Sequence, residues 1–462
     1  MRGRPVQLAV FVVVQMVVLV GLHGALSARP APFVAYPYLQ LGTEVRPDTL
    51  DAVWITTDDD ASWSVQAERA RCGPVRSRRL VVLGRAYRQC SASMTARGAF
   101  EYQVIRNGET VFTARAQAPP RPGASIHVAL MGDVGTGNEP QRALARVLHR
   151  DAPSLVLVAG DVVYPRGQQA DALRNIHGVY NTEGAGGAPI MRAVPFVAAP
   201  GNHDVPGTSV SPVQFDKLPD ALAWFYDWLE PMNGPPVNGP KLGGPVERIE
   251  EMRLSAGERF PRMGSFSFDW GCAHWLVLDS NRYNDWTDPA LRHWVAADLA
   301  AAQGAAWRFV VLHHPPFQSG RTHQDDQWTR TLCDVFEKGR VAVVFAGHVH
   351  NYQRSRPLRF TPRRQSDGRW VAGDGRVDGT FIIDEAFDGS RVTRPSGVVY
   401  VVTGAGGASR LYPMDPLLMN PYTALGVVEQ WSFTDLRVEP RSVIMRQLGA
   451  KGQELDRITI TP

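Results

Sequence analysis

Apolar segments of strand length alternate with helical segments from residue 124 onward, and this order limits the fold more than any other feature of the chain. The apolar runs have the length and bounding residues of buried strands. Strands that alternate with helices predict an α/β core. We predict strands at 126–131, 155–159, 195–199, 274–278, 308–312 and 341–345, and helices at 140–150, 288–302 and 328–338.

The segment before this core has a different pattern. Residues 49–56 alternate aromatic and β-branched side chains with polar ones, which is typical of a half-buried strand. An Asn-Gly pair at 107–108 favours a hairpin turn. We therefore predict a small all-β sandwich over residues 32–118. The proline-rich stretch at 118–123 predicts a stiff linker, so the larger domain spans 124–462.

The first 28 residues have the three-part pattern of an export signal. Arg2 and Arg4 precede an apolar run at 6–22, and small residues follow at 24–28. We predict a cleaved signal peptide over 1–28 and a chain that is secreted or exported to a periplasmic or lysosome-like compartment. No stable membrane association is expected after cleavage. The alternative is an uncleaved anchor, because the run is only slightly short of a membrane span.

The four cysteines matter because disulfides persist outside the cytosol. Cys72 and Cys90 lie in the same N-terminal region, and we predict that they form a bridge. Cys272 and Cys333 are far apart in sequence, and for Cys272 a buried thiol and a bridge both stay open. None of the four has the Cys-x-x-Cys spacing of a zinc site.

Residues that can bind metal ions follow five of the predicted strands. A Gly-Asp or Asn-His-Asp sequence after a strand is usually only a turn. Because the ligand site of an open α/β sheet lies beyond the carboxyl ends of its strands, five such ends can converge on one crevice. Together they supply two carboxylates, a phenol, an amide oxygen and three imidazoles, which suits two metal ions. These residues are Asp133, Asp161, Tyr164, Asn202, His313, His348 and His350.

The residue types fit this chemistry. A carboxylate has two oxygens that can bridge two ions, imidazole suits zinc and iron, and an asparagine carbonyl adds a ligand without adding charge. A tyrosine phenolate suits a trivalent, hard iron. Tyr164 lies three residues after Asp161, so both side chains can reach one ion from a single turn.

The ordered set of motifs resembles the five-block signature of the purple acid phosphatases, and every motif position is matched between residues 133 and 350. The resemblance implies a metallophosphoesterase-type αββα sandwich core preceded by a fibronectin III-like sandwich. It extends to a strand at 266–280 and to the segment at 399–407. The motifs are Asp133-x-Gly135, Gly160-Asp161-x-x-Tyr164, Gly201-Asn202-His203-Asp204, Val310-x-x-His313 and Gly347-His348-x-His350.

The resemblance also implies a role for each metal ligand. Asp133, Tyr164 and His350 would bind Fe(III). Asn202, His313 and His348 would bind the second ion, a divalent zinc, iron or manganese. Asp161 would bridge the two ions.

Two further histidines are implied to contact the substrate, together with Asn202. His203 resembles the histidine that contacts the phosphate or protonates the leaving group. His323 lies ten residues after His313, where the family often has another substrate histidine, and His314 is an adjacent competitor for that role.

The implied function is an acid phosphatase in which a metal-bound hydroxide hydrolyses phosphate monoesters. One alternative is a phosphodiesterase or nucleotide phosphatase of the wider metallophosphoesterase group, although Tyr164 argues against its common dimanganese and dizinc forms. The other alternative is a binding module that has lost turnover. The presence of all seven ligand positions argues against that second alternative.

The net charge and the loops say less about function than the motifs do. The net charge is +4 and the arginines are scattered, which disfavours a nucleic-acid groove and fits small phosphate esters as partners. Glycine and proline number 43 and 35, above ordinary usage, which predicts long loops. The loop regions at 231–261 and 354–395 are either surface excursions or rims over a pocket.

Overall fold

The computed structural model describes residues 32–184, 186–205, 212–215, 217, 220–236, 239–414, 417 and 419–462. The predicted signal peptide at 1–28 lies outside these residues. Within the described part of the chain, no helix is both long and apolar enough to cross a membrane.

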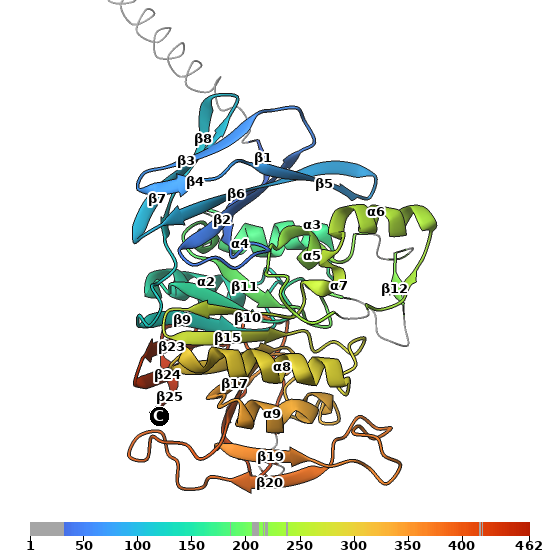
Figure 1. Cartoon of the computed structure of the whole chain (residues 1–462), viewed down its shortest axis with the longest axis vertical. Helices are drawn as coiled ribbons and strands as arrows, with labels where there is room; N and C mark the ends of the chain where they lie inside the picture. Colours follow the sequence, from blue (N-terminus) through green and yellow to red (C-terminus); the bar gives the residue numbers. More distant parts are fainter. Residues whose placement is uncertain are drawn as a thin grey trace, which may run out of the picture. The chain divides into compact units, whose positions relative to one another are not determined.

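Two β-sheets precede the α/β core, as the alternating pattern of the N-terminal segment predicts (Figure 1). One contains β1-β2-β6-β4, with β5 also paired to β6, and the other contains β3-β7-β8. The rings of Trp54 and Trp63, one from each sheet, lie 5.5 Å apart. The fibronectin III-like type stays a prediction. The strands are β1 (Phe33–Gln40), β2 (Thr49–Thr57), β3 (Trp63–Ala67), β4 (Ala70–Cys72), β5 (Arg76–Val82), β6 (Arg85–Ala96), β7 (Ala99–Arg106) and β8 (Glu109–Gln117).

The predicted turn at 107–108 joins β7 to β8. Asn107 and Gly108 both have positive φ, 50° and 83°, as a two-residue hairpin turn of the common type requires.

Two larger sheets form the centre of the α/β core. Their strand orders are β11-β10-β9-β23-β24-β25 and β14-β15-β16-β17-β21-β18-β22. The pairs that carry the polar motifs, β9 with β10, β10 with β11, and β16 with β17, are parallel. The strands are β9 (Ile126–Met131), β10 (Leu155–Ala159), β11 (Phe196–Ala199), β14 (Phe266–Trp270), β15 (Ala273–Leu278), β16 (Trp307–Leu312), β17 (Val343–Ala346), β18 (Tyr352–Ser355), β21 (Val399–Thr403), β22 (Thr423–Val427), β23 (Ser432–Glu439), β24 (Ser442–Gly449) and β25 (Glu454–Ile460).

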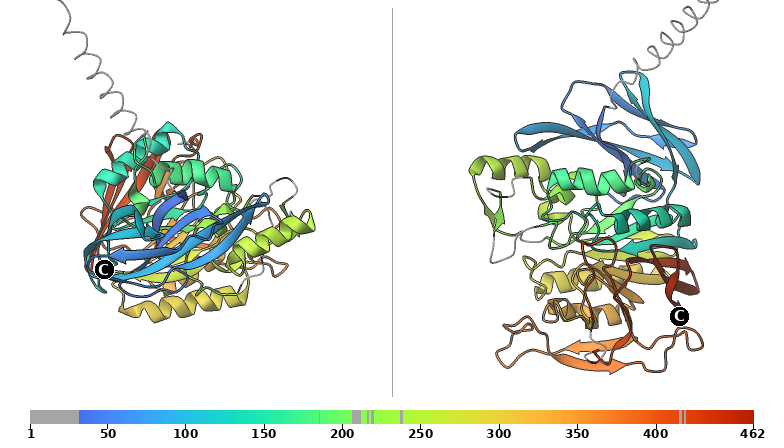
Figure 2. Two further views of the ribbon diagram at one scale, coloured as in Figure 1. Left: turned by 90° about the horizontal axis from the view of Figure 1, so that it is seen from above. Right: turned by 180° about the vertical axis from the view of Figure 1, so that it is seen from behind.

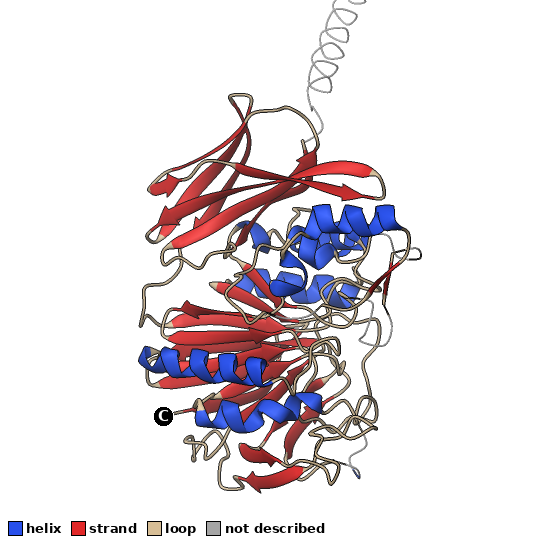
Figure 3. Ribbon diagram, turned by 45° about the vertical axis from the view of Figure 1, so that its right-hand side comes forward, coloured by secondary structure: helices blue, strands red, loops and turns tan. Residues whose placement is uncertain are grey.

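Helices cover the outer faces of both sheets, which gives the predicted αββα order (Figures 1 and 3). Leu144 and Leu148 of α2 pack with Val156 of β10, and Val295 of α8 packs with Val310 of β16. The view from behind shows the same layers (Figure 2). The α-helices are α2 (Glu139–Asp151), α3 (Gln169–Asp171), α4 (Gly178–Tyr180), α5 (Ala223–Asp227), α6 (Val246–Ala256), α7 (Arg259–Arg262), α8 (Pro289–Ala301) and α9 (Cys333–Lys338). A π-helix, η1 (Ala172–His177), and three 3-10 helices, η2 (Ile190–Arg192), η3 (Ala302–Gly304) and η4 (Trp328–Leu332), complete the set described.

The helix starts follow from local chemistry. The side chain of Asn138 accepts a hydrogen bond from the Gln141 amide, and Asp288 accepts one from the Ala290 amide, so both cap a helix N-terminus. The helix predicted at 328–338 is α only from Cys333, because its first turn is the tighter η4.

The prediction of one strand over 266–280 is wrong. The segment is a hairpin of β14 and β15 joined at Gly271. Gly271 has φ 59°, and a Cβ there would lie 2.3 Å from the Ile126 side chain, so the turn needs glycine.

The predicted disulfide between Cys72 and Cys90 is also wrong, because all four cysteines are free. Strand register gives the reason. Cys72 pairs with Met94 on β6, which is four residues along that strand from Cys90. Four residues of strand span about 13 Å, whereas the Cα atoms of a disulfide lie within about 7 Å. Cys272 is a buried thiol.

Both long loop regions contain regular structure. The region at 231–261 includes β13 (Leu242–Gly243), which pairs with β12 (Val213–Gln214), and α6. The hydroxyl of Ser255 bonds the backbone of Val81 in β5, so α6 packs against the N-terminal sheet. The region at 354–395 contains the hairpin of β19 (Leu358–Pro362) and β20 (Gly379–Ile383).

Candidate metal centre

The predicted ligands lie just beyond the carboxyl ends of five strands, β9, β10, β11, β16 and β17. The two sheets meet here, since a Cβ on Gly132, after β9, would lie 2.9 Å from the Cα of Gly347, after β17. The α/β topology thus brings residues 133 to 350 to one place, as expected for an open sheet.

Three of the predicted ligands have unusual backbone angles. Asp133, Asp161 and His348 have φ of 57°, 53° and 67°, in the left-handed region. This region is unfavourable for residues with a Cβ, and such residues gather at functional sites. The sharp turns direct these side chains back across the strand ends.

Glycines in the motifs make room for the ligands. A Cβ on Gly160 would lie 2.5 Å from the His313 ring, and a Cβ on Gly201 would lie 2.2 Å from the Asp161 carboxylate. Both clashes involve groups held in a packed interior, so neither neighbour can move aside at low cost. The Gly in each motif is therefore needed for close packing behind the polar side chains.

The first group of possible metal-ligand atoms, or donor group, surrounds the hydroxyl of Tyr164. Its hydroxyl lies 2.8 Å from Oδ2 of Asp161, 3.1 Å from Oδ1 of Asp133 and 3.2 Å from Nε2 of His350. Both carboxylates are buried, Asp133 fully and Asp161 with 1% of its surface exposed. These are the residues that the sequence assigns to the ferric ion, with the bridging Asp161.

The second group of possible metal-ligand atoms surrounds the ring of His313. Its Nε2 lies 3.1 Å from Oδ1 of Asn202 and 3.3 Å from Oδ1 of Asp161, and the His348 ring is 5.0 Å away. Asp161 therefore faces the first group with one oxygen and the second group with the other. This is the arrangement that a bridging carboxylate requires.

Backbone groups orient the ligand side chains. The Nδ1 atom of His313 is 2.9 Å from the Ala159 carbonyl, and that of His350 is 3.0 Å from the Arg410 carbonyl, so each ring presents Nε2 to the cluster. The amide of His348 donates to Asp133, which fixes that carboxylate.

His203 and His323 lie beside the cluster. The His203 ring is 4.3 Å from that of Tyr164, and its Nε2 is 3.8 Å from Asp161, while its side chain keeps 36% exposure. The His323 ring is 4.0 Å from that of His348, and its Nδ1 is 3.0 Å from Asp326. Both can meet a substrate that reaches the cluster from solvent.

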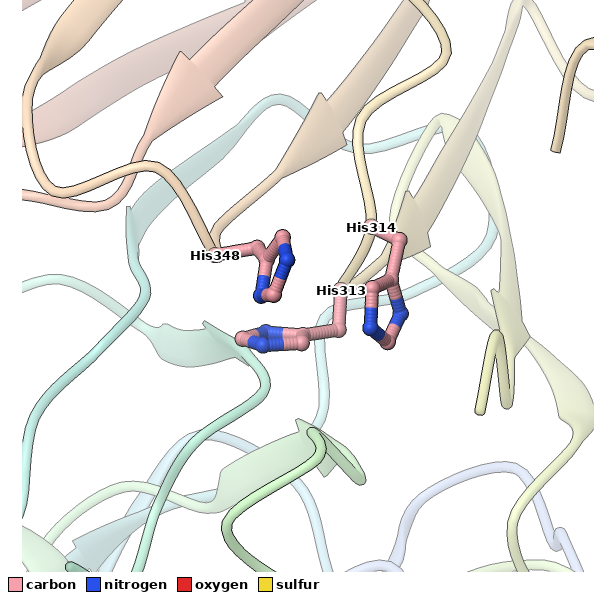
Figure 4. A group of neighbouring side chains, drawn as sticks. All are labelled: His313, His314 and His348. Carbon is pink, nitrogen blue, oxygen red and sulfur yellow. The ribbon is translucent and has the colours of Figure 1, made fainter. Parts of the chain in front are cut away.

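His314, the competitor of His323, is buried and faces the interior. Its Nδ1 is 2.9 Å from the Ser280 hydroxyl, and its ring lies between those of Trp328 and His348. Figure 4 shows the rings of His313 and His314 pointing in different directions, with that of His348 close to His313. Burial, together with the neighbouring histidines, lowers the pKa of His314 well below its usual range, so the ring is neutral.

The charge balance of the cluster fits metal ions. Among the described residues, the ion-pair partners of Asp133 and Asp161 are histidines, with no Lys or Arg within 4.0 Å. Burial opposes a charged His313 ring, but Asp161 and Asp133 outweigh it and raise the His313 pKa to about 9. Burial and the same carboxylates raise the pKa of Tyr164. The two buried carboxylates thus attract positive charge, which bound cations would supply in place of protons on the neighbouring histidines.

Comparison with known proteins finds similarity over the segment that contains these residues. Residues 126–352 match the calcineurin-like phosphoesterase family model. The chain contains a calcineurin-like phosphoesterase domain. The matched range begins at β9 and ends in β18, so it holds all seven predicted ligands.

Named relatives refine this result. Purple acid phosphatase 21 of Arabidopsis thaliana is 24% identical over 238 residues, which cover 50% of this chain and 46% of the relative. Purple acid phosphatase 23 of the same plant is 26% identical over 238 residues, 49% and 47% of the two chains. The chain spans about half the length of the curated relatives it matches. The resemblance to purple acid phosphatases is confirmed over the phosphoesterase domain.

A solved structure matches over a longer range. A purple acid phosphatase isolated from yellow lupin (Lupinus luteus) seeds superposes with a TM-score of 0.63 and 17% identity, covering 92% of this chain and 74% of that chain. At this identity the match shows the fold. The phosphoesterase domain therefore has a metallophosphoesterase fold.

Sequence reasoning missed several residues of the site. Asp326 lies 3.3 Å from Nε2 of His348, and Tyr412 stacks on the His350 ring at 4.1 Å. Asp204 belongs to a predicted motif but has no assigned role. Its carboxylate accepts hydrogen bonds from the backbone amides of Gly201, Val162 and Val163. Asp326 follows His323 by three residues, which was a usable signal, whereas nothing in the local sequence marks Tyr412.

Proposed function

We propose that this phosphoesterase domain is an acid phosphatase that hydrolyses phosphate monoesters at a site for two metal ions. The observation that carries the proposal is the position of Asp161, whose two oxygens face two separate groups of donors. A carboxylate that offers one oxygen to each of two ligand groups could hold two metal ions, and these would supply the charge that polarises a bound phosphoryl group.

The donor types suggest which residues would hold each ion. Asp133, Tyr164 and His350 suit a ferric ion, and Asn202, His313 and His348 suit zinc, ferrous iron or manganese. When bound, such a pair polarises the phosphoryl oxygens and lowers the pKa of water. The residues of the chain hold these donors in place before the substrate arrives, because the Asp and His side chains are buried and bonded to the backbone.

The two exposed histidines supply the remaining step. His203 lies at the edge of the cluster, where its Nε2 can donate a proton to the departing ester oxygen. Asn202 and His203 come from one turn, so the amide and the imidazole are positioned together. His323, beside His348, would contact the leaving group from the other side.

A direct test compares a chromogenic phosphate monoester with the corresponding diester. The proposal predicts turnover of the monoester with water and a much slower reaction of the diester. Preference for the diester, or no turnover of either by protein that contains two ions, would contradict it.

The identity of the first ion has its own test. If Tyr164 binds Fe(III), the pure protein should absorb visible light through phenolate-to-iron charge transfer, and Tyr164→Phe should remove the band. A fully active protein that contains two ions, neither of them iron, would exclude this assignment.

We also propose that the protein is exported. The support is the pattern at residues 2–28, a basic start followed by an apolar run and small residues. Expression of the full chain should yield a mature protein that begins near Arg29 outside the cytosol. A product with its N-terminus intact, held in the membrane fraction, would instead indicate an anchor.

A further inference from the structure

A cavity of about 450 Å³ opens beside the candidate metal centre. His323 and Asp326 line the cavity, and its other walls include Phe381 of β20 together with Tyr422 and Arg330. Of these walls, the proposed phosphate chemistry uses only His323. The cavity is within the range of pockets that bind small organic molecules.

The cavity adjoins the site through two of its lining residues. The His323 ring lies 4.0 Å from that of His348, and Asp326 is 3.3 Å from the same imidazole. A phosphate ester bound at the metal centre would therefore have the cavity next to it, where the alcohol part of the ester can enter.

One wall of the cavity is aromatic. The rings of Phe381 and Tyr422 are stacked, with centroids 5.8 Å apart and planes 21° from parallel. Phe381 is 39% exposed, whereas Tyr422 is 6% exposed. A large apolar side chain left in water next to a catalytic site is stabilised when a flat apolar group covers it.

Arg330 supports the aromatic wall from behind. The residue is 8% exposed, and its guanidinium donates to the Pro316 carbonyl and to Gln327, yet no carboxylate lies within 4.0 Å of it among the described residues. Its central carbon lies 4.7 Å from the ring centre of Phe317, 5.8 Å from that of Phe360 and 5.9 Å from that of Phe381. A buried cation without an anionic partner is favoured by such electron-rich ring faces, so Arg330 helps to hold Phe381 in the wall.

We propose that this cavity binds the alcohol part of the substrate and selects phosphate monoesters of aromatic alcohols. The inference rests on the proposed function, because it assumes that phosphate binds at the metal centre. An aromatic ring fits the combination of a stacked aromatic wall and apolar volume better than a short alkyl group, which offers no flat face.

The proposal assigns a role to the hairpin of β19 and β20, the apolar part of the loop region at 354–395. The hairpin brings Phe381 and Ile383 to the cavity, so it acts as a rim over a pocket. Ile382, between them, does not line the cavity and is 56% exposed. Neighbouring positions on one strand therefore give a matched test and control.

The test uses benzyl phosphate and ethyl phosphate, whose alcohols have similar pKa values, so that the ring rather than leaving-group chemistry is varied. The wild type should prefer benzyl phosphate by roughly tenfold in kcat/KM, chiefly through KM. Phe381→Ala should reduce this preference about fivefold, and Ile382→Ala should retain it. Phe381→Leu, which keeps most of the apolar volume and removes the flat ring, should fall between them and separates ring loss from misfolding.

The outcomes distinguish this inference from the proposed function. If both esters are hydrolysed with equal kcat/KM, the aromatic pocket is wrong and the phosphatase stands. If neither ester is hydrolysed, the proposed function fails, and calorimetric binding of benzylphosphonate against methylphosphonate to the metal-replete protein decides the inference alone. Tighter binding of benzylphosphonate that depends on Phe381 would support the pocket, and equal binding would overturn it.

Discussion

The two ends of strand β9 carry similar residues in different surroundings. Beyond its carboxyl end, Asp133 joins Asp161 and three histidines. Near its amino end, Nε2 of His127 lies 3.0 Å from Asp151 and 2.5 Å from Asp435.

The difference between these two clusters is the source of positive charge. Arg446 donates to Asp435 at 2.8 and 2.7 Å, and Arg437 lies 3.4 Å from Asp151. The amino-end cluster is thus balanced by side chains of the chain itself. The carboxyl-end cluster has no arginine or lysine on its carboxylates within the described residues. A group of His and Asp therefore indicates a metal site only where no Arg or Lys of the fold balances its carboxylates.

The largest effect that separates the clusters is expected for Asp161→Asn. Because Asp161 faces both donor groups, the variant should lose tight binding of both ions and at least a thousandfold in kcat. Asp435→Asn, the matched change in the balanced cluster, should keep both ions. Elemental analysis of the two purified variants makes the comparison, and two tightly held ions in Asp161→Asn would contradict the bridging role.

The next largest effect concerns a histidine outside the donor groups. His203→Ala should leave both ions in place and slow the hydrolysis of an alkyl phosphate roughly a hundredfold. An aryl phosphate with an acidic phenol should lose less, because a good leaving group departs without a proton. His323→Ala should show a smaller effect of the same kind.

The measurement is kcat for both esters on metal-replete protein. Equal losses on the two esters would mean that His203 does not supply the proton. Loss of metal or of thermal stability would mean that it mainly holds the turn at Asn202.

A smaller effect is expected for Asp326, which touches a predicted ligand and not the cluster itself. Asp326→Asn should weaken binding of the divalent ion about tenfold, because the carboxylate orients the His348 ring through its Nε2. Asp325→Asn is the control, since Asp325 pairs with the exposed Arg376. Competition with a chelator gives the affinities, and equal values for both variants would make Asp326 a surface residue without influence on the metal.

The residues that could be predicted from the sequence differ from those that could not in how locally they are encoded. The strands β9, β10 and β16 and the polar residues after them are encoded within a few adjacent positions, so both the α/β core and the clustering of residues 133 to 350 were predictable. Asp326 and Tyr412 reach the site from loops, whose paths depend on packing between distant segments. The disulfide prediction failed for a related reason, because the register that separates Cys72 from Cys90 on β6 is a property of strand pairing.

The smallest effect is expected for a change in the balanced cluster at His127, and it should appear in the free energy of unfolding. Burial opposes a charged His127 ring, but its hydrogen bonds to Asp151 and Asp435 outweigh it and raise the pKa of His127. Burial alone would raise the pKa of Asp435, but the bonds from His127 and Arg446 lower it to about 2.

These shifts set the direction of the pH dependence. The raised His127 pKa contributes stability below its unfolded value of about 6.5, and this contribution is lost as the pH rises through the folded value. The lowered Asp435 pKa contributes above about 4 and is lost toward pH 2. The cluster therefore stabilises the fold most between about pH 4 and pH 6.5.

His127→Gln should lower the free energy of unfolding by about 1 kcal/mol near pH 5.5, and with it the melting temperature by about 1–2 °C. The difference from wild type should shrink as the pH rises, because the wild-type ring then loses its proton. Thermal melts of both proteins from pH 5.5 to pH 10 provide the measurement. A constant difference would mean that the ring acts as a neutral hydrogen-bonding group. Metal content and turnover should match the wild type throughout, since this end of β9 has its own counter-charges.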